Sequence, residues 1–300
     1  MDGIKMNKKR EIICTLTLIL TALIWGCAFA AQSIGAEYVG PFTFLAARTW
    51  IAFFALLPVI AVRDHFLRRK EDFSVRKTAG ISRMLWVGGA VCGFFLFTAS
   101  AAQQIGINQT TTAKAGFITA LYVVLVPILT VFLHQRVGKK IWGCVLLAVI
   151  GLYLLCMRGS FSLSTGDSYM LLCAFLFSLQ ILSVNYFVRF TDPVKLAALE
   201  FLFEGIFAGI CMLLLEPLVY AGFLKALPSI LYAGFMSSAV GYTLQIVAQG
   251  GLDPAVASIA MSLESVFAAL AGWIILGQSL SLRELLGCVL MFTAIVISQT

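Results

Sequence analysis

The sequence predicts an all-α integral membrane protein whose ten transmembrane helices form two inverted five-helix repeats. Three observations support this fold: an apolar composition, ten apolar stretches of membrane-spanning length, and residues that recur at a nearly constant shift. Of the 300 residues, 61% are hydrophobic and 12% are charged, whereas a soluble domain has roughly 45–50% apolar and about 25% charged residues. A soluble fold of this size needs more polar surface than this chain provides.

Each of the ten apolar stretches is long enough to cross a hydrocarbon core of roughly 30 Å, which takes about 17–25 helical residues. The first five lie near residues 12–34, 42–62, 84–105, 113–133 and 141–157. The other five lie near residues 169–188, 194–215, 227–248, 254–276 and 284–300. These spans divide the chain into two domains, a first five-helix repeat at 12–157 and a second at 168–300.

Local signals support several of these helices. Asp192-Pro193 and Asp253-Pro254 each place a capping carboxylate before a proline at the first helical position. Pro127 lies in the middle of the fourth span, where it removes a backbone hydrogen bond. We therefore expect the seventh and ninth spans to begin at these prolines, and the fourth to kink at Pro127 against protein rather than lipid.

The basic residues predict the orientation. If the chain starts in the cytoplasm, sixteen of the 21 Lys and Arg residues fall on the inner side. They are Lys5, Lys8, Lys9, Arg10, Arg63, Arg68, Arg69, Lys70, Arg76, Lys77, Arg83, Arg136, Lys139, Lys140, Arg189 and Lys195. The outer side receives Lys114, Arg158, Lys225 and Arg283, and Arg48 lies within the second span. By the positive-inside rule, both termini are expected in the cytoplasm.

Corresponding residues recur in the two halves. Arg48 and Glu200 each stand seven residues beyond the proline that opens the second and the seventh span. Gln103 and Gln245 are separated by 142 residues, and at the same shift AKAGFITAL in the fourth span aligns with AVASIAMSL in the ninth. The shifts vary between 142 and 152, as loops of different length would produce. Because each half has five spans, the second half enters from the opposite side, and a site between the halves can open alternately to either face.

Four ionisable residues are predicted within the spans, where a charge is expensive. Glu264 is flanked by small residues at helical spacing, which predicts that it faces inward; it either contacts a substrate amine or carries a proton, or it is a structural carboxylate. Glu200 and Glu204 share one helix face. Either one of these two carboxyl groups is neutral, or Arg48 pairs with one of them. Arg48, Glu200 and Glu204 are thus candidates for structural or coupling charges, and the structural role is favoured over a role in transport.

Five polar or aromatic residues are candidates for the lining of a substrate cavity: Trp25, Gln103, Tyr122, Tyr242 and Gln245. Tyr242 and Gln245 share a helix face at a spacing of three. Aromatic rings with a few amides suit a small amphipathic or zwitterionic ligand. Interface anchoring or helix packing is the alternative for each of them.

Other functions lack their signatures. The eight cysteines, Cys14, Cys27, Cys92, Cys144, Cys156, Cys173, Cys211 and Cys288, fall within apolar runs and show no metal-ligand spacing. The two histidines, His65 and His134, lie at span ends outside any H-E-x-x-H motif, and no GxxxxGK[ST] motif is present. The basic residues form no helical stripe typical of nucleic-acid binding. We therefore expect no metal, cofactor, ATP hydrolysis, catalysis or nucleic-acid partner.

Several motifs, in their order and spacing, resemble the drug/metabolite transporter superfamily, and specifically two EamA-like domains in one chain. They are ALIWG from Ala22, AAR ending at Arg48, TAKAGFITALYVVLVP from Thr112, YTLQ from Tyr242 and SLESVFAALAGWIILG from Ser262. The likeness covers almost the whole chain. In one departure, Ser265 stands where the family usually has a proline after the glutamate of its SLEP element, which puts a helix break there in doubt. In another, the G-E-R element that follows the fourth and ninth spans has lost its glutamates.

The resemblance implies ten helices around a central cavity and a secondary transporter, with small metabolites such as amino acids as exported substrates. The expected setting is the bacterial cytoplasmic membrane, with the lipid bilayer and a small-molecule substrate as partners; the sequence leaves a homodimer open. The alternatives are a lipid-linked-sugar flippase, which would have the same architecture, and a membrane partner protein without transport activity. A lateral opening towards lipid would favour the flippase, and a closed, water-filled pocket would favour metabolites.

Overall fold

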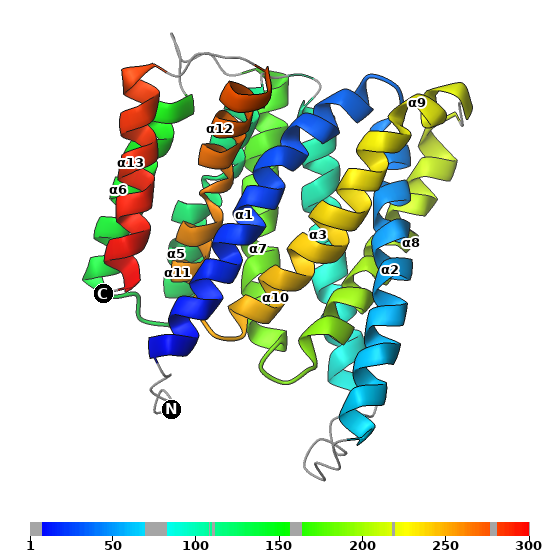
Figure 1. Ribbon diagram of the computed structural model, residues 1–300, viewed down its shortest axis with the longest axis horizontal. Coiled ribbons are helices and arrows are strands. Elements are labelled where there is room, and N and C mark those ends of the chain that lie inside the picture. Colours follow the sequence, from blue (N-terminus) through cyan, green and yellow to red (C-terminus); the bar gives the residue numbers. More distant parts are fainter. Residues whose placement is uncertain are drawn as a thin grey trace.

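The computed structural model describes residues 8–69, 83–107, 109, 112–156, 164–217, 220–276 and 281–299. These residues form helices and no strand, which confirms the all-α fold. The helices lie side by side in one bundle (Figure 1). Several basic residues used in the orientation argument, among them Lys5, Lys70, Arg76, Lys77 and Arg158, lie outside the described residues.

The two halves of the chain cross the bundle in opposite senses. The first half comprises α1 (Lys8–Ala36), α2 (Pro41–Arg69), α3 (Arg83–Ile107), α4 (Thr112–Thr119), α5 (Tyr122–Phe132) and α6 (Lys139–Cys156). The second half comprises α7 (Thr165–Phe187), α8 (Pro193–Leu215), α9 (Tyr220–Leu231), η2 (Tyr232–Tyr242), α10 (Thr243–Gln249), α11 (Pro254–Met261), α12 (Glu264–Leu276) and α13 (Leu282–Gln299). In Figure 1, α1 rises and α7 descends, so the halves are inverted.

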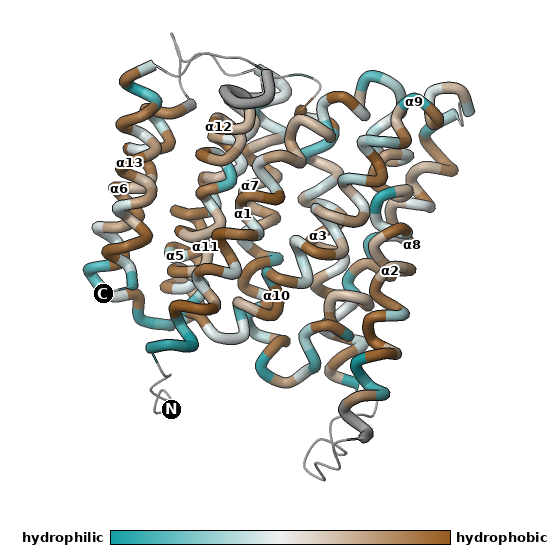
Figure 2. The backbone as a smooth tube through the Cα atoms, in the orientation of Figure 1, coloured by the Kyte–Doolittle hydropathy of each residue, from teal (hydrophilic) through white to brown (hydrophobic). Residues whose placement is uncertain are grey.

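Nine segments of the described chain are long and apolar enough to cross a membrane. The helix α6, with 18 residues, lies alongside α13 and completes ten crossings (Figure 1). The start of α1 and the end of α13 lie at the same end of the bundle, which we call the terminal end; the other is the distal end. The end of α2 and the start of α6, both basic, also lie at the terminal end, where Figure 2 shows hydrophilic residues.

The predicted caps are present. The Asp192 carboxylate accepts hydrogen bonds from the backbone N–H groups of Val194 and Lys195 at the start of α8. Asp253 accepts one from Ala255 N–H at the start of α11. Each carboxylate is followed by a proline whose missing N–H would have no partner in the first turn of a helix, so the two signals reinforce each other.

The fourth span is interrupted before the proline at which we expect a kink. The chain breaks at Ala120 and Leu121, between α4 and α5, while Pro127 lies inside the helix α5. At the break the backbone bonds tighten: Leu121 N–H donates to Ile118 O at 3.1 Å and Val123 N–H to Ala120 O at 3.0 Å. These three-residue bonds replace the four-residue bonds of an α-helix, and the chain changes helix before it reaches the proline.

The ninth span is broken as well, although serine stands in place of the family's proline. The helix α11 ends at Met261 and α12 begins at Glu264. At this break Leu263 N–H donates to Ala260 O at 3.4 Å, and Ser265 N–H donates to Ser262 O at 3.3 Å. The doubt raised by Ser265 is therefore resolved in favour of a break. The two broken spans are the ones that align at a shift of 142 residues.

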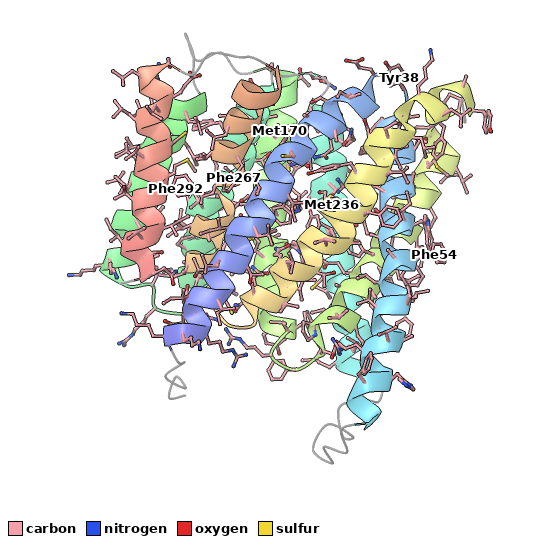
Figure 3. All side chains as sticks on the ribbon, in the orientation of Figure 1. Tyr38, Phe54, Met170, Met236, Phe267 and Phe292 are labelled. Carbon is pink, nitrogen blue, oxygen red and sulfur yellow. The ribbon has the colours of Figure 1, made fainter. Side chains whose placement is uncertain are left out.

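The outer surface of the bundle is apolar. Phe54 and Phe292 stand on opposite outer sides (Figure 3), with 60% and 38% of their surfaces exposed. Leu146 and Leu213 are also exposed. Large apolar side chains exposed in this way would promote aggregation in water, whereas the hydrocarbon core of a membrane accommodates them.

The helices α2 and α8 pack together and are joined at both ends. At the distal end, the Glu216 carboxylate accepts bonds from Phe42 N–H at 2.8 Å, Thr43 N–H at 2.7 Å and the Thr43 hydroxyl at 2.6 Å. At the terminal end, Asp64 pairs with Lys195 at 2.7 Å. Asp64 corresponds to Glu216, and Thr43 to Lys195, at a shift of 152 residues. The two joints therefore occupy corresponding places in the inverted halves.

Candidate functional site

A narrow cavity lies between the two halves, near the middle of the bundle. The space that can hold the centre of a water molecule is about 30 Å³, and the total empty space around it, which includes solvent outside the cavity, is about 470 Å³. Helices of both halves contribute to its wall, including the segments next to the two helix breaks. Seven of the nine residues singled out from the sequence line it: Trp25, Arg48, Gln103, Tyr122, Tyr242, Gln245 and Glu264. Glu200 and Glu204 are buried beside it and do not line it.

Glu264 is placed by the break in the ninth span, because it is the first residue of α12. Only 4% of its surface is exposed, and its Oε1 accepts a hydrogen bond of 3.1 Å from the Tyr122 hydroxyl. Tyr122 is the first residue of α5, so each partner directly follows a break. The two residues are separated by 142 positions, which is the shift that relates their spans. This bond therefore joins corresponding positions of the two halves.

Trp25 reaches the cavity because α1 packs closely against α12. The neighbouring Gly26 makes this possible: a Cβ atom there would lie 2.7 Å from the backbone nitrogen of Ala268 and 2.8 Å from Glu264 O. The Trp25 ring lies 4.7 Å from the Tyr242 ring, with the planes tilted by 51°. Its indole N–H donates to Ser237 O at 3.2 Å. The aromatic wall is thus held by close helix packing and a bond to η2.

The π-helical segment η2 supplies Ser237 and Tyr242 to the cavity. Its wider turns leave Ser238 Oγ buried without a hydrogen-bond partner among the described residues. Segments of π-helix occur frequently at functional sites. The sequence predicts an eighth span over 227–248. It does not predict the π-helical turns, because hydropathy does not distinguish π from α turns.

Arg48 is the cation of the cavity, with 3% of its surface exposed. Its Nη1 donates to Gln32 Oε1 at 3.3 Å and its Nη2 to Ser100 Oγ at 3.2 Å. The nearest carboxylate oxygen is Glu204 Oε1, 4.0 Å from Nη2. Arg48 Nε has no partner among the described residues. A guanidinium group has five N–H donors, so Arg48 retains capacity to bind an anion.

Glu200 lies one turn earlier on α8 than Glu204 and is held differently. Its Oε1 accepts a hydrogen bond of 2.8 Å from Gln180 Nε2, and 0% of its surface is exposed. The helix α3 approaches closely at Gly93, where a Cβ atom would lie 2.6 Å from Glu200 O. The described residues place no cation within 4.0 Å of Glu200, so Glu204 is the carboxyl that faces Arg48.

Further residues that line the cavity are not among those predicted from the sequence, although the sequence contains a signal for them. Phe29 and Gln32 of α1 correspond to Phe177 and Gln180 of α7 at a shift of 148 residues, and all four line the cavity. Within the repeat, Gln32 accepts from Arg48 and Gln180 donates to Glu200. Because Arg48 and Glu200 also correspond, the two halves hold a basic and an acidic side chain in matching amide contacts. Comparing the first span with the sixth would have revealed these residues.

Comparisons with known proteins agree with this architecture. The model of the EamA-like transporter family matches residues 12–157 and 164–300. An uncharacterized transporter of Archaeoglobus fulgidus is 29% identical over 293 residues, which cover 96% of this chain and 86% of that protein. A protein of known crystal structure superposes with a TM-score of 0.73 at 18% identity, covering 95% of this chain and 96% of the other. At that identity the likeness concerns the fold.

Proposed function

Because this chain belongs to the EamA-like transporter family, we propose that it is a secondary active exporter of a small zwitterionic metabolite such as an amino acid. The main support is the central cavity, which places a cation and a carboxyl side chain among aromatic rings and amides between two inverted halves. Pockets of this kind, mostly apolar with a few placed polar groups, bind small molecules.

The charged groups suggest how such a solute binds. Arg48 has a free Nε and binds the carboxylate of the solute, for which a guanidinium is well suited. Glu264, held by the Tyr122 hydroxyl, receives the ammonium group. The rings of Trp25 and Tyr242 contact the remainder of the solute. A neutral or singly charged solute leaves at least one of the two charged groups without a partner.

The inverted halves suggest how the solute crosses. In inverted repeats, the two halves exchange conformations, and a site between them is exposed first to one face and then to the other. Each face is then opened by equivalent movements of corresponding helices. The joints of α2 and α8, which lie at opposite ends of the bundle, fit this exchange because they are built from corresponding residues.

The orientation is part of the proposal. The excess of Lys and Arg on one predicted side supports a bacterial cytoplasmic membrane location with both termini in the cytoplasm. The terminal end of the bundle is then the inner end. Solutes bound from that side are released at the distal end.

The test is a counterflow screen in proteoliposomes. Vesicles loaded with unlabelled L-amino acids or nucleosides are diluted into the corresponding labelled solute, and uptake is compared with that of protein-free vesicles. We expect exchange of at least one amino acid, and a Glu264→Gln variant with a raised KM for it. Tyr186→Phe, on the outer surface, serves as the control and should behave as wild type. Absence of exchange for every solute, combined with movement of a fluorescent lipid between leaflets, would instead support the flippase.

A further inference from the structure

A chain of buried polar side chains leads away from the cavity within the second half. Gln245 Nε2 donates to Gln180 Oε1 at 3.3 Å and to Gln249 Oε1 at 3.4 Å, while Gln180 Nε2 donates to Glu200 Oε1 at 2.8 Å. Gln180 and Gln245 line the cavity. The chain therefore connects the cavity, the buried carboxyl Glu200 and the last residue of α10.

Two further side chains extend this path to the terminal end of the bundle. Asn185 Nδ2 donates to Gln249 O at 3.4 Å and to Leu252 O at 3.1 Å. Arg189 Nη2 donates to Asn185 Oδ1 at 2.7 Å. Arg189 follows the end of α7, and both α7 and α10 end at the terminal end (Figure 1). A set of polar groups thus runs from Glu200 to one face of the bundle, with Gln249 contributing its side chain to one part and its backbone carbonyl to the other.

Parts of the chain are buried without protein partners. Glu200 Oε2, Gln245 Oε1 and Gln249 Nε2 have no hydrogen-bond partner among the described residues, and each of these side chains is at most 1% exposed. Buried polar atoms in proteins almost always have a partner, and ordered water supplies it where the protein does not. These three atoms lie along the chain, where water molecules can complete the connection between its amides.

The described residues of the first half do not repeat this path. Gln180 corresponds to Gln32 at a shift of 148 residues, and Gln245 corresponds to Gln103 at a shift of 142. At this second shift Gln249 corresponds to the buried Ile107. In inverted halves, corresponding positions point to opposite faces. Among the described residues, the polar connection therefore reaches the terminal end, and the corresponding position towards the distal end holds the apolar side chain of Ile107.

The described residues around Glu200 provide no cation to balance a charge. The ionisable groups near it are Glu204 on the same helix, Cys92 on α3 and Tyr242 at the end of η2. Arg48, on α2, faces Glu204 instead. A carboxylate at membrane depth without a paired cation is costly, and a bound proton removes its charge.

We propose that Glu200 is the proton-binding residue that couples export to the proton gradient, and that it exchanges this proton with the terminal face through water molecules bound along the chain of amides. The inference rests on the proposed transport function. In each cycle the carboxylate takes up one proton from water in the cavity while the cavity is open to the distal face, because Gln180 links Glu200 to the cavity. The carboxylic acid later returns that proton to water at the inner end, so one proton crosses inward as the solute crosses outward. The proton site is separate from Glu264, which remains available to the solute.

The first test needs no substrate. Infrared spectra of the purified protein in nanodiscs at neutral pH should contain the carbonyl band of a protonated carboxylic acid that disappears in Glu200→Gln and persists in Glu204→Gln. Gln180→Leu should shift this band to higher frequency, because the carbonyl oxygen loses its hydrogen bond. Glu11→Gln, on α1, is the control and should leave it unchanged. If neither Glu200→Gln nor Gln180→Leu changes the band, the proposal is overturned. If Glu200→Gln does not fold, the shift of the band in Gln180→Leu decides whether Glu200 carries the proton.

The second test uses the amino acid that exchanges fastest in the counterflow screen. Wild-type proteoliposomes with an imposed pH gradient should accumulate it and report matching proton movement through an internal pH dye. Glu200→Gln should lose both while retaining counterflow exchange. Proton-driven accumulation that survives in this variant would contradict the assignment. If wild type shows no exchange at all, the proposed function fails, and the infrared result still decides whether Glu200 binds a proton.

Discussion

At the scale of single residues, the bond between Tyr122 and Glu264 gives a direct prediction. Tyr122→Phe leaves Glu264 Oε1 buried without its donor, which costs about 1–3 kcal/mol of the free energy of unfolding. Tyr186→Phe, with 53% of the side chain exposed on the outer surface, should cost no more than about 0.5 kcal/mol. Thermal unfolding in detergent, followed by tryptophan fluorescence, compares the two. Equal losses would show that the bond contributes nothing to stability.

The neighbouring charges allow a second prediction for individual residues. Arg48→Met leaves Glu204 as a buried charge without its cation, and breaking a buried pair in this way costs about 3–5 kcal/mol. Adding Glu204→Gln should recover part of that loss, whereas adding Glu200→Gln should recover less, because Glu200 bonds to Gln180. A double-mutant cycle on unfolding midpoints measures both couplings. A larger coupling with Glu200 would mean that the 4.0 Å contact with Glu204 is not the relevant one.

At the scale of helices, the Glu216 joint acts as a cap for α2. Because its carboxylate accepts from Phe42 N–H and Thr43 N–H, Glu216→Ala should speed hydrogen exchange of these two amides and cost about 1–2 kcal/mol, as loss of a cap does. Its counterpart Asp64 bonds a Lys195 side chain instead. Asp64→Ala should therefore leave exchange at the start of α8 unchanged.

Asp192→Ala is the matched variant for this comparison. The first amides of α8 are capped by Asp192, so removing its carboxylate should deprotect them as Glu216→Ala deprotects α2. Exchange measured by mass spectrometry on peptides from both helix starts separates the three variants. Faster exchange at α8 in Asp64→Ala would show that the ion pair, rather than the cap, holds that helix end.

The helix interruptions mark the limit of what the sequence reveals about elements. Apolar length predicted every span, and Asp192 and Asp253 marked two helix starts correctly, because capping is a local interaction. The breaks before Tyr122 and Glu264 depend on backbone bonds of three residues, which hydropathy does not register. Neither Pro127 nor Ser265 marks these breaks in the sequence: the proline lies within α5, and the serine follows a break where the family has a proline.

At the scale of the whole molecule, internal repetition is the most informative sequence signal. It predicted inversion from five spans per half, and most residues chosen through charge or recurrence line one cavity. Gln32 and Gln180 recur at a shift of 148 residues rather than 142, so the shift that relates Gln103 and Gln245 does not identify them. The pairing of Arg48 with Glu204 rather than Glu200 required coordinates, because two carboxyls one turn apart are equally plausible in sequence.

The inverted architecture also predicts where each end of the bundle lies in a cell. Five crossings per half return the end of α13 to the side on which α1 starts, and the basic residues predict that this side is the cytoplasm. In a bacterial host, a green fluorescent protein fused after the last residue should fluoresce, and alkaline phosphatase at that point should be inactive. Alkaline phosphatase fused after Pro217, at the distal end, should be active, since α8 ends there. The reverse pattern of activities would invert the assignment and place the terminal end, with the polar chain from Glu200, on the outer side.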